Sequence, residues 1–81
     1  MKEQLIKDID FIIKSLNSID KMKLNFIVNK YNKLKELILN DRLHTNVIKG
    51  SVRAYLDVFS DYENPILEKM SKLEKKIDSI I

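Results

Sequence analysis

The sequence predicts an all-α protein that folds as an antiparallel up-down four-helix bundle. Apolar residues recur at spacings of three and four along most of the chain, which is the period of an amphipathic helix. No segment shows the strict alternation that is typical of a strand, and polar interruptions at 17–20, 40–46 and 63–65 divide the chain into four parts. We expect helices at about 2–17, 20–40, 46–63 and 65–80, in a single helical domain over residues 1–81.

The first predicted helix, 2–17, has one apolar stripe with charged side chains opposite. The stripe comprises Leu5, Ile6, Ile9, Ile12, Ile13 and Leu16. Phe11 projects well away from it, among polar residues.

The second predicted helix, 20–40, has a main apolar stripe and an additional apolar patch on nearly the opposite side. The patch comprises Met22, Phe26 and Leu37. With Phe11 it forms surplus apolar surface, and exposed apolar patches mark interaction sites. The candidate protein-interface residues are therefore Phe11, Met22, Phe26 and Leu37. The alternative is that they cover the ends of neighbouring helices within one molecule.

The third predicted helix, 46–63, is apolar over the widest arc, roughly 200°. Its stripe comprises Ile48, Val52, Tyr55, Phe59 and Tyr62, and it is widened by Val47, Ala54, Leu56 and Val58. We expect this helix to be the most buried. Gly50 and Ala54 lie four residues apart and are small, so we expect close helix packing there. The alternative is that Gly50 only ends a turn.

Asn64 and Pro65 give the clearest boundary in the chain. Proline at a first helical position lacks a donor where none is needed, and asparagine before it is a good cap. The fourth predicted helix therefore begins at Pro65. The alternative is three helices, of which the last is long and kinked at Pro65.

Composition favours a cytoplasmic bacterial protein. The chain has 81 residues, a net charge of +3 and no cysteine, which fits a reducing compartment. No apolar run is long enough to span a membrane, and the N-terminus carries acids where a signal peptide is basic and apolar. Abundant Ile, Asn and Lys are typical of an AT-rich genome. A chain this short buries a marginal core, so pairing with a second copy would stabilise it.

Catalytic and cofactor sites lack the residues that they need. With one glycine there is no phosphate-binding loop, and without cysteine there is no thiolate nucleophile or thiolate metal site. Asp57 and Asp61 follow Arg53 at helical spacing and are interpreted as a solvated face rather than a metal site. His44 is interpreted as an ordinary loop residue. We expect no enzymatic activity, no cofactor, no metal and no small-molecule substrate.

A cluster of lysines on the second predicted helix raises the question of nucleic acid. Lys23, Lys30 and Lys33 are the candidate contacts. The chain lacks the arginines and the recognition helix that base readout requires, so the cluster is interpreted as a solvated face.

The sequence thus predicts a small non-enzymatic helical protein-interaction module. It would act as an accessory or regulatory protein through helix-face contacts with a protein partner or with itself, as a homodimer. The alternatives are a basic nucleic-acid-binding accessory protein and an immunity or antitoxin-like protein that binds a toxin. The last rests on size and fold alone.

Overall fold

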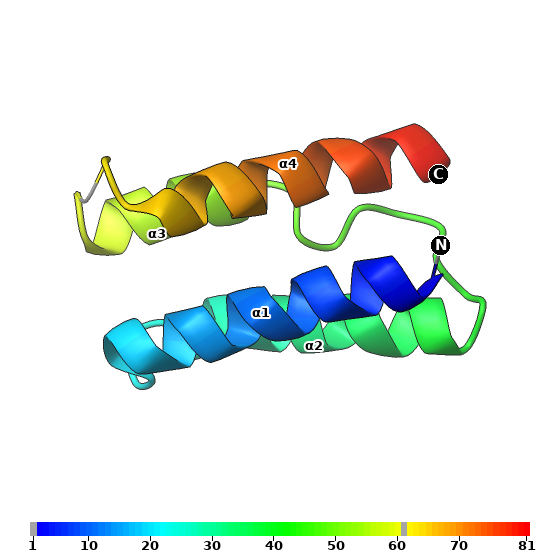
Figure 1. Ribbon diagram of the computed structural model, residues 1–81, viewed down its shortest axis with the longest axis horizontal. Helices are drawn as coiled ribbons and strands as arrows, with labels where there is room; N and C mark the ends of the chain where they lie inside the picture. Colours follow the sequence, from blue (N-terminus) through cyan, green and yellow to red (C-terminus); the bar gives the residue numbers. More distant parts are fainter. Residues whose placement is uncertain (1, 61) are drawn as a thin grey trace.

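The computed structural model describes residues 2–60 and 62–81, and in this part of the chain it contains four helices and no strand. The helices are α1 (Lys2–Asp20), α2 (Asn25–Leu39), α3 (Ser51–Val58) and α4 (Pro65–Ile80). Successive helices run in opposite directions (Figure 1). The predicted all-α four-helix bundle is confirmed.

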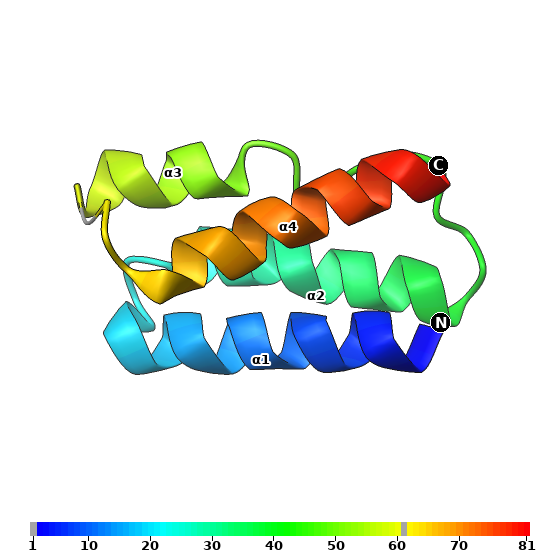
Figure 2. The ribbon, with the colours of Figure 1, turned by 45° about the horizontal axis from the view of Figure 1, so that its top comes forward.

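The four helices are arranged as the corners of a square. Helix α1 packs against α2 and α4, and α3 packs against the same two helices. Figures 1 and 2 show α1 and α2 as one pair and α3 and α4 as the other, with α4 running obliquely across the bundle. No described helix has neighbours on all sides.

The prediction that the third helix is the most buried is wrong. Helix α3 has eight residues, and its fully buried members are Ser51 and Tyr55. Helix α2 buries five, which are Ile27, Val28, Tyr31, Leu34 and Ile38. The wide apolar arc requires a continuous helix, but α3 begins at Ser51 and ends at Val58. Its flanking apolar residues therefore lie in turns, where Ile48 is buried and Tyr62 is 72% exposed.

Gly50 explains why α3 begins late. Its φ of +87° is left-handed, a conformation that glycine adopts without steric cost, and it precedes the first helical residue. A Cβ built on Gly50 would meet no atom within 4 Å. The prediction of close helix packing at Gly50 is therefore wrong, and the alternative that it ends a turn is correct. Ala54 is half-buried and packs against the core.

Helix α4 begins as predicted. The Asn64 side chain accepts a hydrogen bond from the backbone N–H of Ile66 at 3.0 Å, and Pro65 occupies the first turn. Because α3 has ended at Val58, the alternative of one long helix kinked at Pro65 is wrong. Asp61, within the predicted third helix, lies outside the described residues.

The first two helices meet at a tight turn. Helix α1 extends three residues beyond its predicted end, to Asp20, and α2 begins at Asn25 rather than at 20. The Asp20 carboxylate accepts a hydrogen bond from the backbone N–H of Lys23 at 3.0 Å. It therefore closes the turn between the two helices rather than starting the second one.

A left-handed residue also ends α2. Asp41 has a φ of 54°, and the N–H groups of Asp41 and Arg42 donate to the carbonyls of Ile38 (3.2 Å) and Leu37 (2.9 Å). This is the Schellman arrangement, which satisfies carbonyl groups at a helix end. The polar loop predicted at 40–46 follows it.

Candidate functional site

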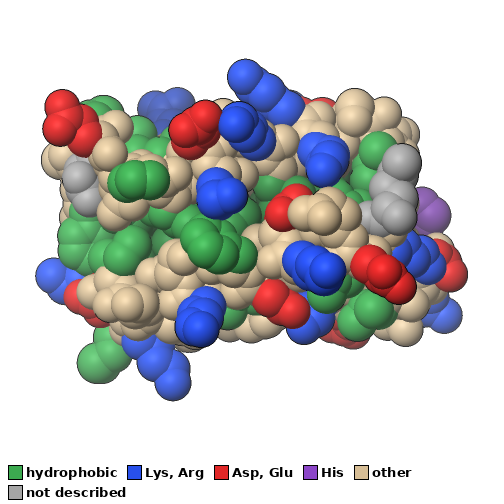
Figure 3. Space-filling model, viewed as in Figure 1, with side chains coloured by type: hydrophobic (Ala, Val, Ile, Leu, Met, Phe, Trp, Pro, Cys, Tyr) green, Lys and Arg blue, Asp and Glu red, His purple; other side chains and the backbone are tan. Residues whose placement is uncertain are grey.

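The seam between α1 and α4 carries an apolar groove where α1 ends and α4 begins. Phe11 and Ile19 line it from α1, and Pro65 and Ile66 line it from α4. The groove has a volume of about 510 Å³, and Phe11 stays 51% exposed within it. Figure 3 looks onto this seam and shows green side chains gathered over its left half, with blue side chains above and below. We call this feature the α1–α4 groove.

Lysines surround the groove and continue along the same seam. Lys14 and Lys69 line the apolar end, and the Lys69 ammonium lies 5.0 Å from the centre of the Phe11 ring. This is a cation–π distance. Lys69 also lines the adjoining hollow, together with Lys72 and Lys76. From here on the α1–α4 groove includes both hollows, which share Lys69, so it is apolar at one end and basic at the other.

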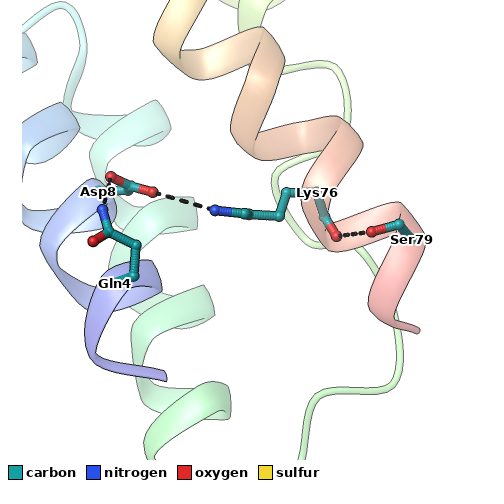
Figure 4. A network of polar contacts seen from close by, with 4 residues as sticks. All are labelled: Gln4, Asp8, Lys76 and Ser79. Atoms are coloured by element: carbon teal, nitrogen blue, oxygen red, sulfur yellow. Dashed lines mark hydrogen bonds and ion pairs between the residues drawn. The ribbon is translucent and has the colours of Figure 1, made fainter. Parts of the chain in front are cut away.

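Asp8, the acidic residue that lines this basic region, already has an ion-pair partner. Asp8 of α1 faces Lys76 of α4, with 4.0 Å between Oδ2 and Nζ, and it accepts a hydrogen bond from Gln4 at 3.1 Å (Figure 4). The ion pair bridges the seam between the two helices. The described side chains that line the groove include four lysines and this one carboxylate. Lys72 also pairs with Glu68, one turn earlier on α4, at 3.0 Å. Four lysines beside two acids leave the positive charge in excess.

Phe11 and Phe26 do not share a surface. Phe26 precedes Lys35 by nine residues on α2, which is two and a half helical turns, so their side chains point in opposite directions. Lys35 pairs with Asp10 of α1 at 2.8 Å. Phe26, 46% exposed, therefore points away from α1, whereas Phe11 lies beside α4.

The other two candidate interface residues lie elsewhere. Met22, 89% exposed, is in the turn between α1 and α2. Leu37 is half-buried and lines a hollow at the opposite end of the bundle, beside Leu5, Leu43 and Ile80. Three of the four predicted interface residues are thus substantially exposed, but they do not form one patch.

The candidate nucleic-acid contacts are all exposed. Lys23, Lys30 and Lys33 lie on or just before α2. The Lys23 ammonium is 5.8 Å from the centre of the Phe59 ring, which places it on the α3 side. Their exposure agrees with a solvated face and leaves the nucleic-acid prediction untested.

Comparison with known proteins gives the family. Residues 1–80 match the family described as "YeeD uncharacterised protein". The chain belongs to the YeeD family. It is also similar to the SWI5-dependent HO expression protein 3 of Candida tropicalis, at 36% identity over 86 aligned positions. That match covers 93% of this chain and 17% of the Candida protein. No solved structure matches the chain.

Residue usage predicts a bacterial origin for this YeeD-family chain. The fungal relative does not test that origin, which stays a prediction. Among the residues that the structure describes, no helix is both long and apolar enough to cross a membrane. Across 2–60 and 62–81, no three acidic, histidine or cysteine side chains are grouped as a metal site would require.

In this YeeD-family chain, hydrogen bonds to Glu74 that the sequence did not predict hold the start of α3 against α4. We call them the Glu74 junction. The Glu74 carboxylate, on α4, accepts hydrogen bonds from the backbone N–H groups of Gly50 (2.7 Å) and Val52 (3.3 Å) and from the Ser51 hydroxyl (3.1 Å). It therefore caps a helix other than its own. The sequence signal is weak, because an acid beside an apolar stripe is normally solvated.

Tyr31 completes this Glu74 junction from α2. Its hydroxyl lies 2.7 Å from the Ser51 hydroxyl, and both residues are fully buried. Serine has one hydroxyl proton, which goes to Glu74, so Tyr31 is the donor to Ser51. Burial raises the pKa of Tyr31 above its ordinary value; the Ser51 hydrogen bond opposes this rise, and the Glu74 charge adds to it. Three helices are thereby joined by one chain of hydrogen bonds.

Proposed function

We propose that this protein is a small non-enzymatic interaction module, an accessory or regulatory protein that binds a protein partner in the α1–α4 groove. The observation that carries the proposal is Phe11, a large aromatic side chain that is 51% exposed in a hollow with three other apolar side chains. Aromatic side chains in such hollows dominate the energetics of protein interfaces.

The architecture supports this assignment. The fold has its own core of sixteen buried apolar residues, and no buried side-chain polar atom in the described part of the chain lacks a partner. Phe11 is not among those core residues. Its position in an open groove between two antiparallel helices fits the mode in which an added helix supplies the missing neighbour.

The relative and the composition support a non-catalytic role. The name of the Candida protein refers to expression of HO, which supports a regulatory or accessory function, although this chain spans 17% of its length. The chain has no cysteine and one glycine, and its single histidine, His44, is exposed in a loop. We further propose that the protein acts in the bacterial cytoplasm, as its residue usage and lack of cysteine favour.

Site-specific photo-crosslinking in the source cell tests the proposal. A photoreactive phenylalanine analogue replaces Phe11, and the same analogue replaces Tyr62 as the matched control, since Tyr62 is an exposed aromatic residue that does not line the groove. We expect a protein cross-linked from position 11 and absent from position 62. Identical products from both positions, or none from position 11, would refute the proposal.

Self-association is the second candidate, and the exposed apolar side chains of α2 and its preceding turn favour it. Met22 is 89% exposed and Phe26 is 46% exposed. Leaving this apolar surface in water is unfavourable for a chain with a small core, and a dimer would bury it. Sedimentation equilibrium over a wide concentration range would show a dimer that Phe26→Asp dissociates without loss of helical circular dichroism. A monomer throughout that range would exclude the homodimer.

A further inference from the structure

We propose that the occupant of the α1–α4 groove is an amphipathic helix of a protein partner that is apolar toward one end and acidic toward the other. This inference rests on the function proposed above and names the class of its partner. It follows from the chemistry of the groove at its two ends.

The apolar end supplies the anchoring contacts. Phe11 and Ile19 on α1 face Pro65 and Ile66 on α4 across this hollow. The rest of its lining is two serines, two lysines and Asn64, whose side chain caps α4. Ile19 is 38% exposed, so the apolar surface extends beyond the single aromatic ring. Leucine or phenylalanine side chains of a partner would bury their surface here.

The basic end supplies the charge. Lys69, Lys72 and Lys76 are spaced by three and four residues on α4, so they lie along one side of that helix. All three line the hollow at the basic end of the groove. Lys76 pairs with Asp8 at 4.0 Å and Lys72 with Glu68 at 3.0 Å, both exposed pairs. Lys69 lies over the Phe11 ring. A partner with carboxylates at the matching spacing would neutralise the excess positive charge.

The dimensions fit a short helix. Lys69 and Lys76 are seven residues apart, about 10 Å along α4, and the apolar end begins one turn earlier at Pro65. The whole groove, from Pro65 to Lys76, therefore corresponds to a partner helix of about 12 residues. In a partner helix antiparallel to α4, acids at i, i+4 and i+7 would face Lys76, Lys72 and Lys69, and apolar residues in the following turns would face Phe11.

Charge argues against a second copy as the occupant. In a two-fold symmetric contact through this groove, the lysines of one copy would meet either the lysines or the apolar end of the other, and neither supplies a carboxylate. The intramolecular pair of Asp8 with Lys76 leaves no free acid among the lining residues to compensate. A different chain with acidic residues avoids this repulsion.

Selection from a displayed library of random peptides of about 12 residues tests the inference on the intact protein. We expect the selected peptides to carry Asp or Glu at i, i+4 and i+7, followed by Leu or Phe. A parallel selection on a variant with Lys69→Glu, Lys72→Glu and Lys76→Glu should reverse the preference and yield basic peptides. Selected peptides without acids would overturn the inference, whatever their apolar content.

Affinity measurements on a selected acidic peptide provide the second readout. Fluorescence anisotropy should show a roughly tenfold loss for Lys69→Glu with Lys72→Glu, and a loss of less than about twofold for Lys33→Glu, an exposed lysine outside the groove. Circular dichroism confirms that each variant is folded. Equal losses for the groove and control variants would overturn the inference.

The two proposals fail in different ways. Peptides that are neutral but still require Phe11 would overturn the acidic partner and leave the groove as a docking site. If none of the selected peptides loses its binding when Phe11 is replaced by aspartate (Phe11→Asp), the docking function itself is overturned. A short DNA duplex, or phosphatidylglycerol vesicles, bound at physiological salt and released by Lys69→Glu would assign the lysines to phosphate instead and overturn the inference.

Discussion

Replacing Glu74 by alanine tests whether α3 depends on a carboxylate from another helix. The N-cap residue of α3 is Gly50, which has no side chain to accept from the free N–H groups of the first turn. Glu74 takes this role, with Oε1 at 2.7 Å from the Gly50 nitrogen and Oε2 at 3.3 Å from the Val52 nitrogen. In an eight-residue helix the first turn is a large part of the whole.

We expect Glu74→Ala to lower the free energy of unfolding by about 2 kcal/mol. Loss of a helix cap costs roughly 0.5–2 kcal/mol, and a hydrogen bond to a charged group contributes roughly 1.5–3 kcal/mol when buried. Glu74 is half-buried, so water replaces part of what is lost. For a domain of this size the melting temperature should fall by roughly 8–16 °C.

Urea denaturation followed by far-ultraviolet circular dichroism measures the effect. The matched control is Glu36→Ala, because Glu36 is exposed on α2 and its side chain makes no hydrogen bond or ion pair with the residues that the structure describes. We expect this control to lie within about 0.5 kcal/mol of the wild type. If the two variants differ by less than about 0.5 kcal/mol, the Glu74 carboxylate does not stabilise the start of α3.

Four further predictions concern the same junction and the helix ends. Ser51→Ala should cost roughly 1–3 kcal/mol and Tyr31→Phe roughly 0.5–1.5 kcal/mol in urea titrations, because the first leaves the buried Tyr31 hydroxyl unpaired. Above pH of about 10, stability should fall as pH rises, since the raised pKa of Tyr31 lets only the unfolded chain lose that proton; Tyr31→Phe should flatten this fall. Gly50→Ala should cost about 1 kcal/mol from its positive φ alone, and Gly50→Asn less, as thermal unfolding would show. Asn64→Ala should cost about 1 kcal/mol through loss of the α4 cap.

The four helices were predictable because the signals that define them are local. The start of α4 depends on Asn64 and Pro65, which act through their own backbone and the next two residues. The length of α3 was not predictable from apolar spacing, because a helical projection assumes an unbroken helix. The left-handed residue Gly50 separates α3 from the turn that contains Ile48. Ile48 is still buried in the core, although it is not part of the helix.

The candidate site was predictable in part, for a related reason. Periodicity fixes the angle of a side chain about its own helix axis, so the exposure of Phe11 and Phe26 followed from their distance from the apolar stripes. It does not say which helix lies beside each of them. Lys69 beside the Phe11 ring and Asp10 paired with Lys35 place the two aromatic residues on different sides of the α1 and α2 pair. A partner helix bound in the α1–α4 groove would cover Phe11 and leave Phe26 exposed, so Phe11→Asp and Phe26→Asp should affect different interactions.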